Sequence, residues 1–172
     1  MLQLLKGNVF CAKIGSMAIE RVRDFFNSHG IADRILEFPV SSATVELAAQ
    51  ALGCEAKRIA KTLSFLNGES VVLVVAAGDA RIDNVKFKAR FGIKPKMLDA
   101  EHVLAATGHE VGGVCPFVIP EGVPVYLDVS LQRFVTVFPA CGSNNSAIEL
   151  TLAELQTYAD TTAWVDVCKN WD

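Results

Sequence analysis

Hydrophobic positions change their spacing along the chain, and each change predicts a different element. Apolar residues three or four positions apart, with a capping residue before them or a glycine after them, predict helices over residues 19–28, 45–52, 83–91, 100–106 and from 151 onward. We expect Ser42 to be the N-cap of the second helix and Gly53 to end it. Thr151 and Glu154 have the spacing of a capping box, so the last helix begins there.

Runs rich in β-branched and aromatic residues predict strands. They cover residues 34–39, 61–66, 71–76, 124–128, 134–138 and 147–150. Asn67 and Gly68 separate the second and third runs and predict an antiparallel hairpin. Because strands outnumber simple strand-helix alternation, we expect an α+β fold with a curved, mixed, barrel-like β-sheet surrounded by helices.

Composition supports one compact domain over residues 1–172. Residues 1–16 lack periodicity, which is compatible with a peripheral N-terminal arm and with a segment outside the common fold. The chain has 172 residues, of which 51% are hydrophobic and 20% charged. Its apolar runs are too short to span a bilayer, and its first residues lack the basic start of a secretory signal. We therefore expect a soluble cytoplasmic protein with no membrane partner, either a monomer or a homodimer.

The cysteines argue against a disulfide framework and against a zinc site. Five of them, an odd number, are widely spaced, with no C-x-x-C pair and no histidine at metal-ligand spacing. They are Cys11, Cys54, Cys115, Cys141 and Cys168. The sequence predicts neither a metal nor a cofactor.

Charge is unevenly distributed. The chain has a net charge of −3, but residues 81–96 hold six basic side chains and one acidic one, a net +5 that leaves −8 for the remainder. A nucleic-acid contact would involve Arg81, Lys86, Lys88 and Arg90. The same tract is also what an ordinary solvated helix face looks like, and the residues alone leave both interpretations open.

A glycine-rich loop follows the fourth predicted helix. Gly112 and Gly113 allow backbone with positive φ and close approach of a ligand, and Pro116 restrains the chain after them. Such a loop can direct free N–H groups at an oxygen, although a simple turn has the same composition.

Five segments occur in a distinctive order. They are residues 44–53, an alanine-rich helix; Ile59-Ala60-Lys61-Thr62-Leu63; Thr107-Gly108 with Gly112-Gly113-Val114-Cys115-Pro116; Leu127-Asp128; and residues 142–151. With them, residues 18–155 resemble the YbaK and prolyl-tRNA synthetase editing-domain superfamily, whose free-standing members deacylate mischarged tRNA.

The resemblance implies a reaction and a set of catalytic residues. Lys61 corresponds to a lysine that helps to hold the terminal adenosine and its phosphate, whereas the residues alone also allow a lysine that extends from a strand end into water. The loop of Gly112, Gly113, Cys115 and Pro116 would stabilise the oxyanion through backbone N–H groups while water attacks the ester. No metal is required.

The resemblance also implies substrate-binding positions and a substrate class. The positions are Phe117, Asp128, Gly142, Ser143 and Asn145. Asp128 is equally compatible with a structural turn at a strand end. Alanine, 2-aminobutyrate or cysteine mischarged onto tRNA(Pro) is the expected substrate, with serine and threonine also open, and transient contact with prolyl-tRNA synthetase is expected.

The chain departs from its relatives in two places. Serine and asparagine replace the basic residues that the cysteinyl-tRNA-deacylating branch has near Gly142, and the stretch after Pro116 lacks a glycine. Substrate identity therefore does not transfer from that branch. Two other hypotheses remain: a non-catalytic protein that binds or regulates aminoacyl-tRNA ends, and a hydrolase with Cys115 as nucleophile and His109 as base.

Overall fold

The computed structural model describes residues 17–172, so the predicted arm over residues 1–16 lies outside the described residues. A first helix covers residues 17–28. The further helices and 3-10 turns, in chain order, are η1 (Ala32–Arg34), α2 (Val45–Leu52), η2 (Ala56–Arg58), α3 (Asn84–Phe91), α4 (Ala100–Thr107), η3 (Val129–Arg133) and α5 (Leu152–Tyr158). The strands are β1 (Ile35–Glu37), β2 (Ile59–Asn67), β3 (Ser70–Ala77), β4 (Arg81–Ile82), β5 (Val125–Asp128), β6 (Thr136–Pro139), β7 (Ser146–Ile148), β8 (Leu150–Thr151), β9 (Ala163–Val165) and β10 (Cys168–Lys169).

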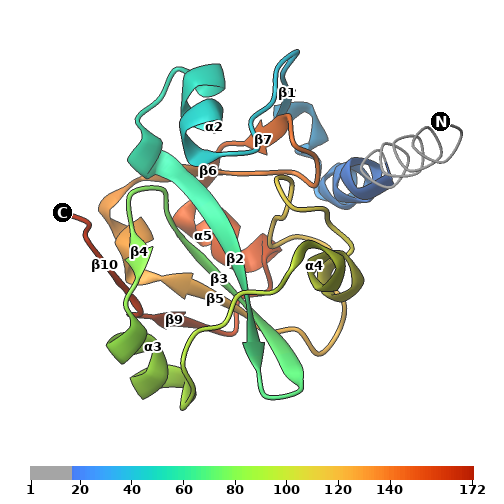
Figure 1. Ribbon diagram of the computed structural model, residues 1–172. Coiled ribbons are helices and arrows are strands. Elements are labelled where there is room, and N and C mark those ends of the chain that lie inside the picture. Colours follow the sequence, from blue (N-terminus) through green and yellow to red (C-terminus); the bar gives the residue numbers. More distant parts are fainter. Residues whose placement is uncertain (1–16) are drawn as a thin grey trace, which may run out of the picture.

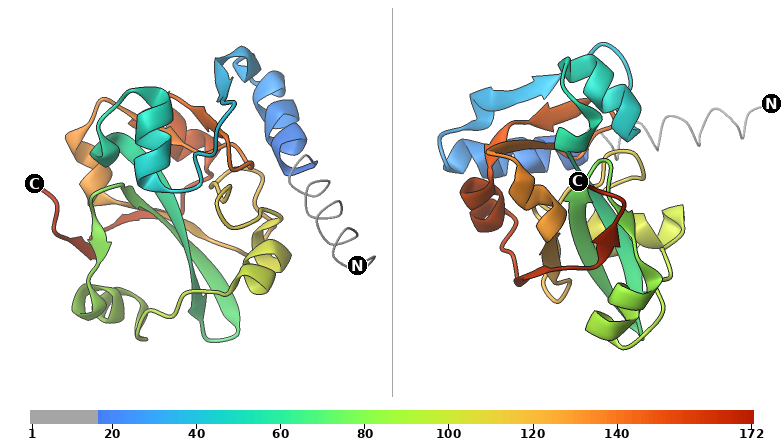
Figure 2. Two further views of the ribbon diagram at one scale, coloured as in Figure 1. Left: turned by 45° about the horizontal axis from the view of Figure 1, so that its top comes forward. Right: turned by 90° about the vertical axis from the view of Figure 1, so that its left-hand side faces the viewer.

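Six strands form one mixed sheet in the order β8-β6-β2-β3-β5-β9. β2 and β3 are antiparallel and pair from Ala60 with Ala77 to Asn67 with Ser70, which confirms the predicted hairpin. β6 runs parallel to β2, and β5 runs parallel to β3. The sheet curls, with α2, α3 and α4 on the side that faces the viewer in Figure 1 and α5 on the opposite side in Figure 2. The predicted α+β fold with a curved, mixed, barrel-like sheet is therefore confirmed.

The main core fills the inside of this curl. β3 is buried along almost its whole length, because it is a central strand covered on both faces. Phe26, from the first helix, packs edge-on against Phe117 with ring centroids 4.8 Å apart. A smaller cluster, formed by Ala48, Ala49, Ile59 and Phe138, attaches α2 to the end of the sheet.

Capping residues explain where the helices begin, and one prediction about them is wrong. Thr44, and not Ser42, is the N-cap of α2, because its hydroxyl accepts from the amide of Leu47 at 3.2 Å. Ser42 instead uses its amide and its hydroxyl on the carbonyl of Asn144, at 2.6 and 3.3 Å. The position of Ser42 is thus set by a long-range partner that the local sequence does not reveal.

The predicted capping box is confirmed at the start of α5. The hydroxyl of Thr151 accepts from the amide of Glu154, and the carboxylate of Glu154 accepts from the amide of Thr151. Arg34 donates to both oxygens of the same carboxylate, at 2.9 and 3.1 Å. Together with the hydrogen bond from the amide of Thr151, these contacts lower the pKa of Glu154 to about 2. This pairing connects η1 to the C-terminal helix.

Candidate functional site

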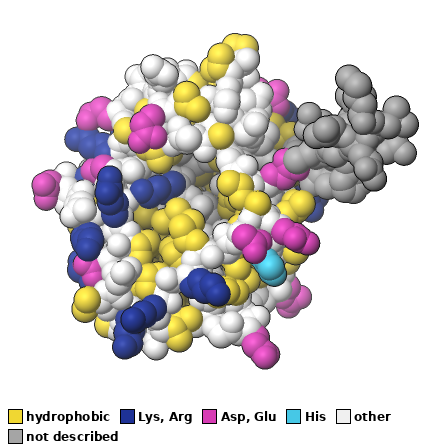
Figure 3. Space-filling view, viewed as in Figure 1, with side chains coloured by type: hydrophobic (Ala, Val, Ile, Leu, Met, Phe, Trp, Pro, Cys, Tyr) yellow, Lys and Arg dark blue, Asp and Glu magenta, His cyan; other side chains and the backbone are white. Residues whose placement is uncertain are grey.

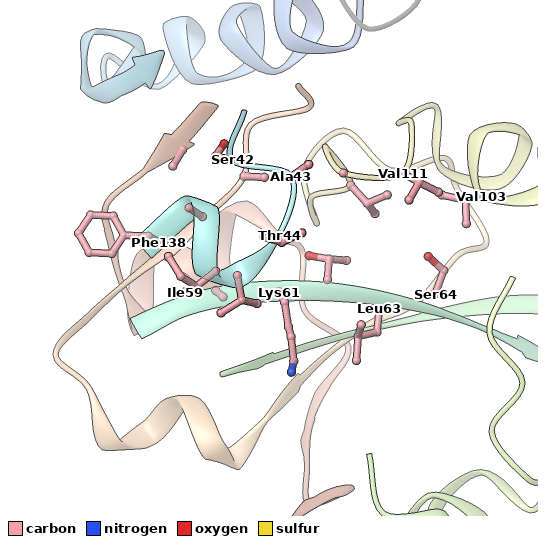
Figure 4. Close-up of a pocket in the computed structure, with 18 of the residues that line it drawn as sticks. Ser42, Ala43, Thr44, Ile59, Lys61, Leu63, Ser64, Val103, Val111 and Phe138 are labelled. Atoms are coloured by element: carbon pink, nitrogen blue, oxygen red, sulfur yellow. The ribbon is translucent and has the colours of Figure 1, made fainter. Parts of the chain in front are cut away.

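A cavity of about 370 Å³ lies between α2, β2 and the loop after α4. It borders the edge of β2 that faces away from β3, which we call the outer edge of β2. Hydrophobic side chains gather in the middle of this face of the molecule in Figure 3, and Figure 4 shows how the lining residues surround the space. The lining is mainly apolar, with a few hydroxyl groups and one lysine. It comprises Ser42, Ala43, Thr44, Val45, Ala48, Ile59, Ala60, Lys61, Thr62, Leu63, Ser64, Met97, Leu98, Val103, Val111, Gly112, Val114, Phe138, Ala140, Ser146 and Ala147.

Three segments that are distant in sequence meet beside this cavity because two glycines have no side chain. A Cβ on Gly113 would lie 2.8 Å from the carbonyl carbon of Ser143, and one on Gly112 would lie 3.0 Å from the Cβ of Ala43 and 3.7 Å from that of Asn144. The glycine loop, the turn after β6 and the segment before α2 are therefore in direct contact. Gly112 also has a φ of 95°, which disfavours other residues.

The amide groups of the glycine loop differ in whether they have an acceptor. The amide of Gly113 is already used, since it donates to the carbonyl of Glu110 at 3.0 Å. The amides of Gly112 and Val114 donate to no acceptor within residues 17–172, and both residues line the cavity. Gly113 and Pro116 are not part of the lining.

Lys61 carries a half-buried positive charge. Its Nζ donates to the carbonyls of Gly78, at 3.1 Å, and of Ala80. The lysines that form ion pairs within residues 17–172 are others, so no described carboxylate pairs directly with this ammonium, although the charges of Asp79 and Glu46 act on it from farther away. Burial lowers the pKa of Lys61 below its ordinary value of 10.5. In Figure 4 the side chain leaves β2 on the side away from Thr44 and Val111, and two of its three donors are occupied.

The predicted nucleic-acid-binding residues differ in whether their side chains already have partners within the protein. Lys86 is engaged, since its Nζ donates to Asp166 at 2.8 Å and to a backbone carbonyl at 3.0 Å. Arg90 lies over two aromatic rings, with centroids 5.3 and 5.4 Å from its guanidinium carbon. Arg81 and Lys88 are exposed and form no ion pair within the described part of the chain.

Two further lysines extend this basic surface toward the cavity. Lys94 and Lys96 are exposed and form no ion pair with any residue from 17 to 172. The carbonyl of Lys96 accepts from Leu66 at 2.9 Å, and the next residue, Met97, lines the cavity. Basic side chains thus lead from α3 to one rim of the cavity, as Figure 3 shows.

Comparison with known proteins places this architecture in a family. The sequence profile of the aminoacyl-tRNA editing domain matches residues 40–158. The chain belongs to this family. A candidate trans-editing enzyme for prolyl-tRNA synthetase has the same fold, with a TM-score of 0.79, 28% identity, and coverage of 88% of this chain and 97% of that one. The predicted resemblance is therefore confirmed.

Two sequence relatives show where this editing domain occurs. This chain is 54% identical to YwhH, an uncharacterized protein of Bacillus subtilis strain 168, over 91% of its own length and all of that protein. It is 29% identical to proline–tRNA ligase of Shouchella clausii strain KSM-K16, over 69% of this chain but 20% of the ligase. The domain therefore resembles a full-length small protein and one part of a much longer synthetase.

The editing domain holds Cys115 next to His109, the pair that the cysteine-hydrolase hypothesis requires. The Sγ of Cys115 lies 3.5 Å from the Nε2 of His109, and this Nε2 lies 2.9 Å from the carbonyl of Phe117. A carbonyl only accepts, so Nε2 carries a proton and cannot act as a base toward the thiol. Burial also raises the pKa of the Cys115 thiol to about 12. The sulfur is fully buried and does not line the cavity.

Two predicted substrate-binding side chains have structural partners in the editing domain. Asp128 is buried, and its two oxygens accept from the amides of Ser130 and Val167, both at 2.9 Å. Phe117 is buried in the main core against Phe26. Neither side chain lines the cavity, so their contact with a substrate stays a prediction, and the observed bonds favour the structural alternative for Asp128.

The turn after β6 is held by its own polar side chains. Ser143 Oγ lies 2.9 Å from Asn145 Oδ1 and 2.7 Å from Ser146 Oγ, and Asn145 Nδ2 donates to the carbonyl of Phe38 at 2.9 Å. Gly142 has a φ of 92°. Ser146 lines the cavity, whereas Gly142, Ser143 and Asn145 lie behind the lining. Their direct contact with substrate stays a prediction.

Sequence reasoning missed the hydroxyl groups of the lining. Alternation along β2 places Thr62 and Ser64 on the same face, and this signal was available from the run that contains Lys61. The apolar lining from Met97, Val103 and Val111 could not be recognised, because these residues come from separate segments. Within residues 17–172, no cluster of three or more potential ligands is arranged to hold a metal ion, and no helix is long and apolar enough to cross a bilayer.

Proposed function

We propose that the protein is a trans-editing deacylase that hydrolyses the ester linking a small amino acid to the 3′ end of tRNA(Pro). One observation carries this proposal: Lys61, which forms no ion pair within residues 17–172, and two glycine-loop residues whose amides have no described acceptor belong to the lining of one cavity. A buried cation without a carboxylate partner favours an anionic ligand, and the terminal phosphate of an RNA supplies one. Family membership supports the same activity.

The proposed reaction needs no nucleophile from the protein. Water attacks the ester carbonyl carbon, and the carbonyl oxygen becomes an oxyanion that the amides of Gly112 and Val114 stabilise. The bond to the ribose oxygen then breaks, this oxygen takes a proton, and the free amino acid leaves as its carboxylate. Each well-placed amide contributes roughly 3–4 kcal/mol to the stability of the transition state.

The proposed substrates are small. Alanine, 2-aminobutyrate and cysteine suit a confined cavity with mainly apolar walls. tRNA(Pro) is proposed because the relatives include prolyl-tRNA synthetases and a candidate enzyme that edits for one. The same proposal places the protein in the cytoplasm with its tRNA, in transient contact with prolyl-tRNA synthetase.

A deacylation panel tests the proposal. Purified protein is mixed with tRNA(Pro) charged separately with alanine, 2-aminobutyrate, cysteine, serine, threonine and proline, and the loss of aminoacyl-tRNA is followed over time. We expect at least one non-cognate ester to be hydrolysed well above the rate without enzyme. If every ester decays at the uncatalysed rate while the tRNA still binds, the protein is a non-catalytic binder.

Replacing Cys115 by alanine is expected to leave kcat/KM within about threefold of the wild type, because the sulfur is buried, protonated and outside the cavity. The free energy of unfolding should fall by about 1 kcal/mol because the sulfur no longer packs in the core. Single-turnover deacylation and thermal unfolding measure the two effects. A loss of activity of a hundredfold or more in a folded variant would support the cysteine-hydrolase hypothesis instead.

Neutralising Lys88 or Lys96 by glutamine is expected to weaken tRNA binding similarly for all tRNA sequences. The slope of log K against log salt should also become shallower by roughly 0.7–0.9 for each phosphate that the variant no longer neutralises. Lys57→Gln is the matched control, because Lys57 already pairs with Glu55 at 3.1 Å. Equal salt slopes in Lys88→Gln, Lys96→Gln and the control would remove these lysines from the interface.

A further inference from the structure

The outer edge of β2 is paired at both of its ends but not in its middle. At the start of the strand, β6 pairs with Ile59 and Ala60. Toward the other end, the amide of Leu98 donates to the carbonyl of Ser64 at 3.1 Å, and the chain beyond the basic tract continues alongside the strand. The gap between β6 and the segment at Leu98 coincides with the cavity. The cavity lining includes Phe138 from β6 on one side of the gap and Leu98 on the other.

Thr62 occupies this gap. In a strand, the N–H and C=O groups of alternate residues point to the same edge. Ser64 and Leu66 both bond to the outer edge, the first through its carbonyl and the second through its amide. Thr62 lies two positions before Ser64, so its own N–H and C=O point to this edge. No residue from 17 to 172 pairs with them there.

The side chain of Thr62 is also without a partner. Its Oγ1 is buried at the cavity wall, and no donor or acceptor in the described structure reaches it. Buried hydroxyl groups nearly always form hydrogen bonds, because an unsatisfied one loses its bonds to water without replacement. A hydroxyl oxygen and a main-chain carbonyl of the same residue therefore lack donors beside one cavity.

An aminoacyl ester supplies donors that fit this arrangement. Its α-ammonium group has three N–H donors and must find acceptors when it leaves water. The lining of the cavity contains no carboxylate, so its acceptors are hydroxyl and carbonyl oxygens. We infer that Thr62 is a substrate-binding residue whose carbonyl and hydroxyl oxygens accept hydrogen bonds from the α-ammonium group of the aminoacyl ester. This inference rests on the proposed deacylase function.

The substitution Thr62→Val removes the hydroxyl and retains the shape of the side chain. Because the hydroxyl has no partner in the protein, the variant should unfold at a Tm equal to or above that of the wild type. Its kcat/KM for aminoacyl-tRNA should fall about 10- to 100-fold, as for the loss of a hydrogen bond to a charged group. Thr62→Ser retains the hydroxyl and should stay within a few-fold of the wild type.

Thr161→Val is the matched control. The Oγ1 of Thr161 is likewise buried without a partner, but this residue does not line the cavity. The control should show the same unchanged or raised Tm and a wild-type kcat/KM. A purely structural role for the Thr62 hydroxyl would lower Tm and activity together, so the combination of raised Tm and reduced activity is specific to substrate binding.

N-acetylated aminoacyl-tRNA completes a double-mutant cycle, in which the effect of Thr62→Val is compared on substrates with and without the α-ammonium group. Acetylation removes the ammonium, so the wild type should lose activity on this substrate, and Thr62→Val should cause little additional loss. An equal effect of Thr62→Val on both substrates would overturn the assignment to the α-ammonium group. A wild-type kcat/KM for Thr62→Val on the free aminoacyl ester would overturn the inference altogether.

A binding experiment separates this inference from the proposed function. A 3′-aminoacylamino adenosine, in which an amide replaces the ester, is titrated into wild-type and variant proteins and followed by calorimetry. Weaker binding to Thr62→Val than to Thr161→Val supports the role of Thr62 even if no ester is hydrolysed. Equal affinities for the two variants would reject it even if the wild type is an active deacylase.

Discussion

Replacing Lys61 by methionine is expected to lower kcat/KM for mischarged tRNA by roughly 30- to 1,000-fold, as when one partner of a buried, hydrogen-bonded charge pair is removed. The ammonium is half-buried, has no carboxylate partner in the described structure and is oriented by the carbonyls of Gly78 and Ala80. Methionine retains much of the apolar stem. Single-turnover kinetics and thermal unfolding measure activity and folding separately.

The pH dependence distinguishes a charge effect from a packing effect at Lys61. Burial lowers the pKa of Lys61 below 10.5, so on the alkaline side the ammonium is lost at a lower pH than for an exposed lysine. As the pH is raised, wild-type activity should therefore begin to fall before pH 10.5 is reached, because Lys61 loses its proton. The Lys61→Met variant should lack this alkaline decline. Lys61→Arg retains the charge and should recover part of the activity. A fully active Lys61→Met variant would remove Lys61 from the proposed site.

Replacing Gly112 by alanine is expected to lower kcat roughly 100- to 1,000-fold, the usual effect of losing one oxyanion donor. The added Cβ would approach that of Ala43 to 3.0 Å at a φ of 95°, so the loop must move and its amide leaves the edge of the cavity. The strained backbone should also reduce the free energy of unfolding by about 1–3 kcal/mol. Single-turnover rates and denaturant titration measure the two losses.

Gly122→Ala separates backbone strain from damage to the site. Gly122 has a φ of 88°, but a Cβ there meets no atom within 4 Å, and the residue does not line the cavity. The control should lose stability to a similar extent and retain its activity. If both variants lose activity in proportion to stability, the Gly112 loop has no special part in the reaction.

Local sequence signals predicted most elements correctly because their causes are local. Asn67 and Gly68 satisfy the turn of the β2–β3 hairpin by themselves, and Gly53 takes the left-handed conformation that ends α2. The capping box at the start of α5 likewise involves residues three positions apart. Such features need few long-range contacts, so composition and spacing were sufficient to place them.

The candidate site was only partly predictable. The motifs at Lys61 and Gly112 identified two segments that border one cavity. The N-cap of α2 was assigned to Ser42, whose actual partner, Asn144, lies about a hundred residues away in the sequence. The sequence suggested Cys115 and His109 as a possible pair but not what orients the imidazole, because the carbonyl of Phe117 reaches it only in the folded loop.

The order of residues alone established the α+β class, the hairpin, the glycine loop and the family of this chain, since each depends on near neighbours or on a distinctive succession of motifs. Folding decided which groups remain without partners. The ammonium of Lys61 forms no ion pair among the described residues and donates to backbone carbonyls instead. The hydroxyl and edge carbonyl of Thr62 lack donors there, because β6 and the segment after Lys96 leave a gap along β2. Whether a polar group is satisfied depends on every segment packed around it, so this property belongs to the tertiary structure.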